Sequence, residues 1–180
     1  MENLIGTQVP NVTFKVRVPK PTAVGTCSAI DAEWNEITTD EIFKGKKVVL
    51  FALPGAYTPT CSSTHLPGYE GKYEELKALG VDDVVCLSVN DPFVMYEWGR
   101  GQGVTKVRLI PDGSGTFTEK IGMLVKKDNL GFGNRSWRYS MLVDNGEIKQ
   151  VFSEPGFGDN AESDPFEVSG VDTMLAYLKG

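Results

Sequence analysis

Two short apolar runs constrain the fold of this chain more than any other feature of its sequence. Residues 47–53 read KVVLFAL, and residues 84–89 read VVCLSV. Nearly continuous runs of this length are typical of strands that are buried on both faces of a sheet. Between them, apolar residues recur with helical spacing at Tyr73, Leu76 and Leu79. Because parallel strands need a crossover connection, the whole segment predicts a parallel β–α–β unit.

Further elements follow from the pattern of apolar and turn residues. They are an alternating strand at 12–18, a helix from Asp91, a short strand at 107–110, a hairpin with strands 139–143 and 148–152, and a closing helix at 172–178. The hairpin is indicated by Asp-Asn-Gly-Glu at 144–147, since Asn-Gly favours a tight turn. This order predicts an α/β protein with a thioredoxin-like fold, a central mixed β-sheet flanked by helices. Because no repeat or linker divides the chain, we expect a single domain over residues 1–180.

The composition excludes several classes of function. The net charge is −6, and Lys and Arg are not gathered into the large clusters that bind phosphate, so no nucleic-acid partner is expected. No apolar run approaches the roughly 20 residues that span a bilayer. The first residues, MENL, do not resemble the start of a secretory signal. We therefore expect a cytoplasmic protein with no membrane partner.

The three cysteines, Cys27, Cys61 and Cys86, do not form a disulfide framework or a metal site. Their number is odd, no CxxC pair occurs, and the single histidine, His65, does not complete a zinc site with them. Reduced thiols in a cytosolic setting fit this pattern better than disulfides or a metal site do. We expect no metal and no cofactor.

Cys61 is the cysteine that lies at a predicted helix start. Thr58 can act as the N-cap and Pro59 suits the first helical position, which puts Cys61 at the third. Backbone N–H groups there have no partner within the helix, and the helix dipole favours negative charge, so both stabilise a thiolate. These features favour a reactive thiol over a buried structural cysteine. Further along, Pro67 cannot donate to Ser63, which predicts a kink or a break in the helix.

The spacing of Pro54, Thr58 and Cys61 resembles the active-site signature of the peroxiredoxins, P-x-x-x-T-x-x-C. Longer stretches resemble the type II, or peroxiredoxin-five-like, branch of that family: PGAYTPTCSSTHLPGY, VCLSVNDPFVM, IPDGSGTF and GMLVKKDNLGFGNRSWRYSMLVDNG. The resemblance extends from Val9 to the C-terminus. It is greatest to bacterial and cyanobacterial members, including the peroxiredoxin half of peroxiredoxin–glutaredoxin fusions.

The resemblance implies a role for four residues. Cys61 would attack a peroxide and become a sulfenic acid. The Thr58 hydroxyl would hydrogen-bond the thiolate or the peroxide, and Pro54 would shield the site from water. Arg135 would orient the thiolate and stabilise the developing negative oxygen, work that suits a planar and permanently charged donor.

The resemblance also implies the partners of the reaction. Hydrogen peroxide and organic hydroperoxides would be the substrates, and glutathione, glutaredoxin or thioredoxin would be the reductant. Members of this branch commonly form homodimers through the edge that carries the active site. In this chain the aromatic residues Tyr57, Phe132 and Trp137 are the candidates for that contact.

His65 lies four residues after Cys61 and shares its helix face if the helix is regular. A Cys–His dyad is one interpretation of this spacing. Two side chains on one face project in parallel, however, and that suits a hydrogen bond from nucleophile to base poorly. We therefore expect His65 to pack behind the reactive residues or to support them.

Cys86 is a possible resolving cysteine, because type II members have a cysteine at this spacing after the reactive one. Its place inside a buried strand argues for a core residue instead, since a disulfide needs α-carbons within about 7 Å. Cys27 has no counterpart in the family that we can assign. We therefore expect a mechanism with one catalytic cysteine and an external thiol as reductant.

Other functions fit the residues less well. A thiol–disulfide oxidoreductase needs a second cysteine three positions after Cys61, where the chain has Thr64. The glycine-rich segments at 113–115 and 131–133 lack the Lys-Ser/Thr ending of a phosphate-binding loop. A redox-sensing or chaperone-like thiol protein without fast turnover stays as the alternative, and the rate of Cys61 oxidation distinguishes it from an enzyme.

Overall fold

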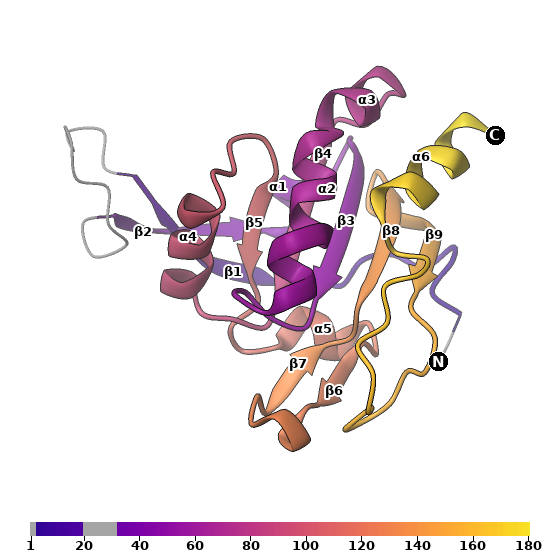
Figure 1. Ribbon diagram of the computed structural model, residues 1–180. Coiled ribbons are helices and arrows are strands. Elements are labelled where there is room, and N and C mark those ends of the chain that lie inside the picture. Colours follow the sequence, from indigo (N-terminus) through magenta and orange to yellow (C-terminus); the bar gives the residue numbers. More distant parts are fainter. Residues whose placement is uncertain (1–2, 20–31) are drawn as a thin grey trace.

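The computed structural model, which describes residues 3–19 and 32–180, contains a five-stranded sheet at its centre (Figure 1). The strands lie in the order β5-β4-β3-β8-β9. Their bounds are β3 Lys47–Leu53, β4 Asp83–Ser88, β5 Arg108–Pro111, β8 Tyr139–Asp144 and β9 Glu147–Ser153. β3, β4 and β5 run parallel, whereas β8 is antiparallel to both β3 and β9. The sheet is mixed, as predicted, and β3 is its central strand.

The other elements flank this sheet or pair with each other. The strands are β1 Thr13–Val18, β2 Glu33–Thr38, β6 Leu124–Lys126 and β7 Asn134–Ser136. The α-helices are α1 Thr39–Phe43, α2 Leu66–Gly71, α3 Tyr73–Ala78, α4 Pro92–Gly101, α5 Thr116–Lys120 and α6 Val171–Lys179. A π-helical turn, η1, covers Cys61–His65, and a 3₁₀ turn, η2, covers Asp128–Leu130. β1 pairs with β2, and β6 pairs with β7, each antiparallel.

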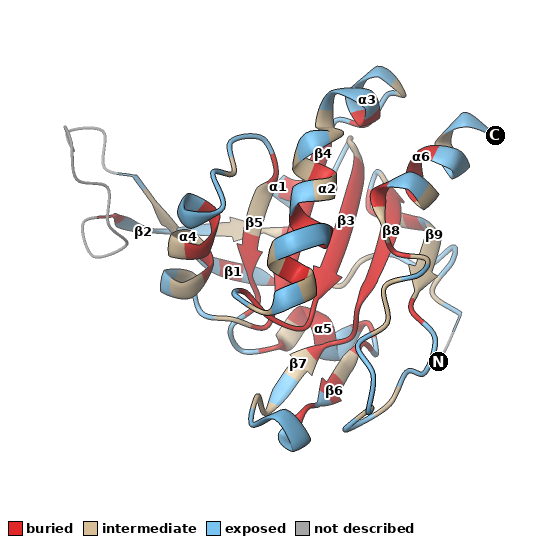
Figure 2. Ribbon diagram, viewed as in Figure 1, coloured by how far each residue is buried: buried red, intermediate tan, exposed pale blue. Residues whose placement is uncertain are grey.

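Two hydrophobic cores, one on each face of the sheet, explain the continuous apolar run of β3. Val48, Leu50 and Ala52 point into the core that includes α1, α5 and β1. Val49, Phe51 and Leu53 point into the core that includes α2, α4 and α6. Side chains alternate between faces along a strand, so a strand that is covered on both faces has few positions open to polar side chains. Figure 2 shows β3 buried along its length.

The predicted hairpin is confirmed, and its turn is tight. β8 ends at Asp144 and β9 begins at Glu147, with Asn145 and Gly146 between them. Both turn residues have positive φ, 48° and 82°. This is the backbone that a two-residue hairpin turn requires and that Asn-Gly adopts readily.

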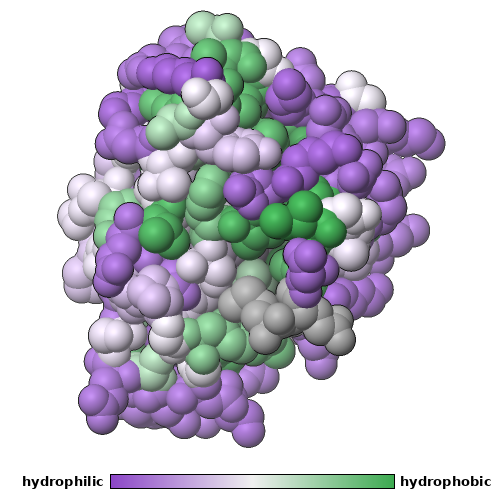
Figure 3. Space-filling model, turned by 90° about the vertical axis from the view of Figure 1, so that its right-hand side faces the viewer, coloured by the Kyte–Doolittle hydropathy of each residue, from purple (hydrophilic) through white to green (hydrophobic). Residues whose placement is uncertain are grey.

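The sheet ends at β9, and the N-terminal segment pairs with one end of this edge strand. Gly6 N–H donates to the Ile148 carbonyl, and Ile148 N–H donates to Thr7, both at 2.8 Å. The face of the molecule shown in Figure 3 carries hydrophilic side chains around a band of hydrophobic ones. Within residues 3–19 and 32–180, no helix has the length and apolar character that crossing a membrane requires.

Candidate active site

The loop between β3 and the Cys61 helix is held in place by Asn90, which follows β4. The Asn90 side-chain oxygen accepts hydrogen bonds from Ala56 N–H at 3.0 Å and from the Ser88 hydroxyl at 2.7 Å. Within this loop Tyr57 has a φ of 64°, a left-handed conformation that a bulky side chain rarely adopts. The parallel pairing of β3 and β4 thus brings their carboxyl ends together and fixes the loop that leads to Cys61.

Cys61 is the third helical residue, as predicted, because the helix begins at Pro59. Its side chain is fully buried. From Cys61 the helix widens into the π-helical turn η1, in which Leu66 N–H donates to the Cys61 carbonyl five residues earlier. Ser62 is held by helix α4, since its hydroxyl accepts a hydrogen bond from the Trp98 indole at 3.0 Å.

Of the kink or break that we predicted at Pro67, a break is absent, since α2 contains this proline and continues to Gly71. The change of helix type comes instead directly before α2, at His65. Proline removes one donor from the helical ladder, and a widened turn beside it lets the helix continue with an altered bonding pattern. The interruption occurs later, at Lys72, between α2 and α3.

Thr58 stands at the predicted cap position, but its side chain does not cap the helix. The hydroxyl donates to the Gly55 carbonyl at 2.7 Å, and Thr58 N–H approaches the same carbonyl at 3.4 Å. The tight loop after β3 places this carbonyl within reach, and the local hydrogen bond replaces the capping bond. Because the hydroxyl proton is engaged in the bond to Gly55, the Thr58 oxygen can only accept a hydrogen bond from another group. Pro54, at the start of the loop, is buried.

Arg135 reaches the same edge of the sheet from β7. Its guanidinium donates to the carbonyl of Val89, the residue before Asn90, and lies 5.9 Å from the centre of the Phe132 ring. Burial lowers the pKa of Arg135 from its ordinary value, although an arginine stays charged under such shifts. Among residues 3–19 and 32–180, no carboxylate forms an ion pair with it. A half-buried cation with no carboxylate partner in the described residues therefore lies where β4 ends, next to the residue that holds the loop before Cys61.

His65 is the last residue of η1 and is buried in a cage of aromatic rings. Its ring centre lies 4.8 Å from that of Phe51 and 4.9 Å from that of Phe166. The Nε2 atom lies 3.2 Å from the Ser169 carbonyl, and the Nδ1 atom lies 3.2 Å from Arg138. Burial and then the charge of Arg138 lower the pKa of His65 to about 3. Because both nitrogens have partners, neither is free to act as a base toward Cys61.

Arg138 was not singled out from the sequence, although it has the most unusual environment in this region. Its side chain is 1% exposed, and its guanidinium forms an ion pair with Asp164 besides its contact with His65. Its Nε atom has no hydrogen-bond partner among the described residues. Nothing in the run Ser-Trp-Arg-Tyr at 136–139 distinguishes this arginine from an exposed one, since its partners lie far away in sequence.

Cys86 lies in the middle of β4, opposite Phe51 of β3, and is fully buried. Burial, and then the proximity of Cys61, raise the pKa of its thiol well above the ordinary value. Cys61 and Cys86 belong to the same hydrophobic core and are both free thiols. Cys27 lies outside the described residues.

The aromatic residues expected at a dimer contact differ in exposure. Tyr57 is 61% exposed and Phe132 is half-buried, whereas Trp137 is 1% exposed. The Trp137 indole donates to the Glu154 carbonyl, and the Lys127 ammonium lies over its ring. The expectation that Trp137 offers a surface contact is therefore wrong, because its ring belongs to the core under β6 and β7.

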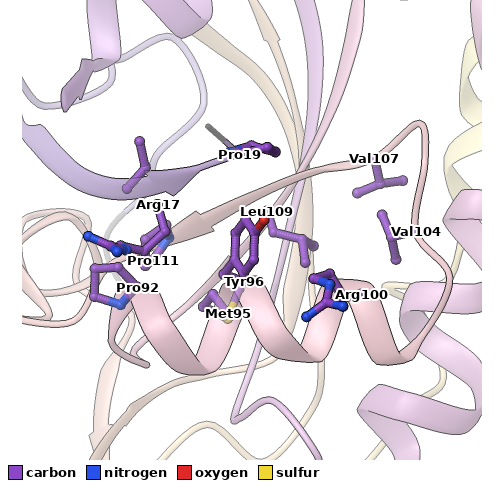
Figure 4. A pocket seen from close by; sticks show the side chains of 12 residues that line it. Arg17, Pro19, Pro92, Met95, Tyr96, Arg100, Val104, Val107, Leu109 and Pro111 are labelled. Carbon is purple, nitrogen blue, oxygen red and sulfur yellow. The ribbon is translucent and has the colours of Figure 1, made fainter. Parts of the chain in front are cut away.

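A groove between β1, α4 and β5 lies apart from this site (Figure 4). Apolar side chains such as Met95, Val104 and Leu109 line it, with Arg17 and Arg100 among them. None of the residues that line it is a predicted site residue. The candidate active site is thus the loop and helix start around Cys61 rather than this hollow.

The comparisons with known proteins cover almost the whole chain. A protein-family model described as Redoxin matches residues 5–175. The chain is 61% identical over 173 residues to the peroxiredoxin sll1621 of Synechocystis sp., which covers 96% of this chain and 90% of that protein. It is 48% identical over 178 residues to the hybrid peroxiredoxin hyPrx5 of Haemophilus influenzae, 99% of this chain and 67% of the hybrid.

Solved structures of peroxiredoxins resemble the fold of this chain. The antioxidant protein of Plasmodium falciparum, described as a 1-Cys peroxiredoxin, superposes with a TM-score of 0.88 at 33% identity, over 97% of this chain and 98% of that one. Reduced Prx3 of Vibrio vulnificus in complex with hydrogen peroxide gives a TM-score of 0.82 at 38% identity, over 99% and 97% of the two chains. These likenesses confirm the predicted thioredoxin-like α/β fold.

The burial of Cys86 makes a prediction about its reactivity. In the native protein, Cys86 will stay unmodified by iodoacetamide even above the ordinary thiol pKa of about 8.5, because burial disfavours its thiolate. Mass spectrometry of peptides after a timed reaction measures this, and the same reaction in denaturing urea is the control. Rapid labelling of Cys86 in the native protein would contradict the assignment of a closed β4 core.

Proposed function

The chain belongs to the peroxiredoxins, enzymes that reduce peroxides with a thiol, and we propose that Cys61 supplies this thiol. The observation that supports Cys61 most directly is its position, in the first turn of a helix at the carboxyl end of the central strand β3. The thiolate attacks one oxygen of the peroxide, and the O–O bond breaks. The other oxygen leaves with the bonding electrons, takes up a proton and departs as water or an alcohol. Cys61 is left as a sulfenic acid.

Arg135, Thr58 and Pro54 are proposed to assist this step. Arg135 brings a charged donor without a carboxylate partner in the described residues, and such a donor stabilises negative charge on the peroxide oxygens as their bond breaks. The Thr58 oxygen, whose proton is held by Gly55, is available as an acceptor for the hydroxyl of a hydroperoxide. Pro54 is buried between the strand and the loop and helps to keep water from the sulfenic acid.

The sulfenic acid is proposed to be reduced by an external thiol, in a cycle with one catalytic cysteine. A first thiol forms a mixed disulfide with Cys61 and releases water, and a second thiol displaces Cys61 and leaves as the disulfide. The burial of Cys86 in mid-strand supports this choice, since an attack by its thiol would have to take place inside the closed hydrophobic core. The likeness to a protein described as a 1-Cys peroxiredoxin supports it as well.

Glutathione, with or without glutaredoxin, is the proposed reductant, and thioredoxin is the second candidate. The resemblance to peroxiredoxin–glutaredoxin fusions and the greater length of the hybrid relative favour the glutathione system. Hydrogen peroxide and organic hydroperoxides are the proposed substrates. We place the reaction in the cytoplasm, where free thiols such as Cys61 and Cys86 persist.

Residues 1–180 are proposed to act as a single domain that pairs with a second copy. One sheet with a core on each face supports a single folding unit. The exposed Tyr57 and half-buried Phe132, on the edge that carries Cys61, are the proposed dimer contacts.

The one-cysteine cycle predicts different results for two cysteine variants. Cys61→Ser will lose peroxidase turnover, whereas Cys86→Ser will keep it with glutathione and glutaredoxin or with thioredoxin, because Cys86 takes no part in the cycle. Steady-state assays with each purified reducing system on hydrogen peroxide and an alkyl hydroperoxide measure this. Suppose instead that Cys86→Ser is oxidised once at Cys61 but that none of the external thiols supports its turnover. Cys86 is then the resolving cysteine, and the proposed cycle is wrong.

The role of Arg135 predicts a loss of rate in the first step. Arg135→Gln will slow the oxidation of Cys61 by about 100-fold, the usual effect of removing one donor to a developing negative oxygen. Stopped-flow fluorescence at a range of peroxide concentrations measures this rate. Arg100→Gln is the matched control, since Arg100 pairs with Glu97 on the surface of α4. Equal rates in the two variants would remove Arg135 from the site.

A further inference from the structure

The segment 88–91, called here the junction, connects the loop after β3 with Arg135, which reaches it from β7. In Figure 1, β7 lies below the arrowhead of β3. The Val89 carbonyl accepts a hydrogen bond from the Arg135 guanidinium. The next residue, Asn90, holds the loop through its side chain, since Ala56 N–H donates to the Oδ1 atom at 3.0 Å. Two adjacent residues of the junction therefore contact two separate parts of the candidate site.

The orientation of the Asn90 amide is determined by its neighbours. Ala56 N–H can only donate, so the amide oxygen, and not the nitrogen, faces the loop. The Ser88 hydroxyl lies 2.7 Å from the same oxygen and 3.3 Å from the Leu53 carbonyl, and its single proton favours the shorter contact. Because Ser88 is fully buried in β4, this second bond holds the Asn90 side chain in the rotamer that reaches Ala56.

The loop that Asn90 holds is tightly folded. A Cβ atom on Gly55 would lie 3.2 Å from the Thr58 methyl group and 3.8 Å from the Asn90 Oδ1 atom. Tyr57, directly after Ala56, has a φ of 64°, and a residue keeps such a conformation only where its surroundings impose it. The bond from Ala56 to Asn90 is one of the contacts that impose it. A loop released at Ala56 would relax at Tyr57 and move the helix start.

We propose that Asn90 is a positioning residue, which sets the place of Cys61 relative to Arg135 by holding Ala56. The inference rests on the proposed roles of Cys61 and Arg135. Ala56 comes five residues before Cys61, and the strained turn lies between them. Because Val89 and Asn90 are consecutive, one peptide unit fixes the distance between the two points of attachment. Attack on a peroxide needs the sulfur, both oxygens and the stabilising charge in one alignment, so a small displacement of the loop lowers the rate.

An uncharged amide suits this position. Its oxygen can accept from both Ala56 and Ser88, as a carboxylate oxygen also could. A carboxylate, however, would bring a negative charge to the edge of the sheet where Arg135 is proposed to meet the peroxide. It would attract the guanidinium and compete with the developing negative oxygen. Asn90 thus holds the loop and leaves the charge of Arg135 to the substrate.

Hydrogen exchange of the Ala56 amide, measured by nuclear magnetic resonance, tests the attachment itself. Asn90→Leu keeps the number of side-chain heavy atoms and removes the acceptor, so the Ala56 amide is expected to exchange about tenfold faster than in the wild type. Asn35→Leu is the matched control, because the Asn35 oxygen accepts from Glu36 N–H on the exposed strand β2. It will leave the Ala56 amide unchanged. Equal exchange in Asn90→Leu and the wild type would overturn the proposal.

Stopped-flow measurement of Cys61 oxidation by hydrogen peroxide tests the consequence for the reaction. Asn90→Leu is expected to react about tenfold more slowly, a common effect of slight misplacement, and Asn35→Leu as fast as the wild type. Asn90→Asp keeps an oxygen acceptor for Ala56. It is expected to recover most of the rate in 1 M salt, where the screening length is about 3 Å and the added charge has little reach. A wild-type rate in Asn90→Leu, or no recovery in Asn90→Asp, would contradict the assignment.

A double-mutant cycle tests whether Asn90 acts through the alignment with Arg135. In the Arg135→Gln background, Asn90→Leu is expected to slow oxidation little further, because the alignment has lost its second member. Effects that multiply would overturn the proposal. If Asn90→Leu does not fold, Ser88→Ala replaces it in the cycle, since it removes only the bond that holds the Asn90 rotamer, and a slowing of about threefold is expected. Failure of the proposed function is recognised separately, since wild-type Cys61 would then react no faster than free cysteine, whatever the Ala56 amide shows.

Discussion

The parallel pairing of β3 with β4 is the constraint on which the site depends. Because the two strands end at the same edge, Asn90 after β4 can fasten the loop after β3 through Ala56. That loop sets where the Cys61 helix begins, and the burial of β3 on both faces makes its end a rigid support. Arg135 reaches the same edge through Val89. The chemistry of the site is thus built on the most buried part of the molecule.

The two arginines near the site, Arg135 and Arg138, differ in burial and in ion pairing. Arg135 is half-buried and has no carboxylate partner in the described residues, so its charge is available to an incoming anion. Arg138 is fully buried, and its charge is shared between Asp164 and His65. A cation without a carboxylate partner suits a developing negative oxygen, and this is the role proposed for Arg135.

Patterns of local sequence predicted the framework well, since they depend on burial and turn chemistry. The runs at 47–53 and 84–89 predicted β3 and β4, and Asn145-Gly146 predicted the hairpin. Cys61 was correctly placed at the third helical position. These features are set by residues that are neighbours in the chain, which is why a single sequence reveals them.

Features that depend on distant partners could not be predicted in this way. The Thr58 hydroxyl bonds Gly55 because of how the loop folds, and Trp137 is buried because Lys127 and Glu154 close over it. The strand pair β6 and β7, which carries Arg135, is too short to produce a clear alternation. The buried state of Arg138 depends on Asp164, and its contact with His65 joins positions far apart in the chain. The candidate site residues were proposed from the resemblance to the family signature, whereas the hydrogen bonds and ion pairs around them could be seen only in the folded structure.

The central claim is that Cys61 is the thiol that reduces peroxide, and trapping its oxidised form tests this most directly. The reduced protein is mixed with an equimolar amount of hydrogen peroxide in the presence of dimedone, which labels sulfenic acids, and the labelled peptide is identified by mass spectrometry over a time course. We predict a single adduct, on Cys61, that forms far faster than on free cysteine in the same buffer. A label on Cys27 or Cys86, or a rate at Cys61 no greater than that of free cysteine, would contradict it.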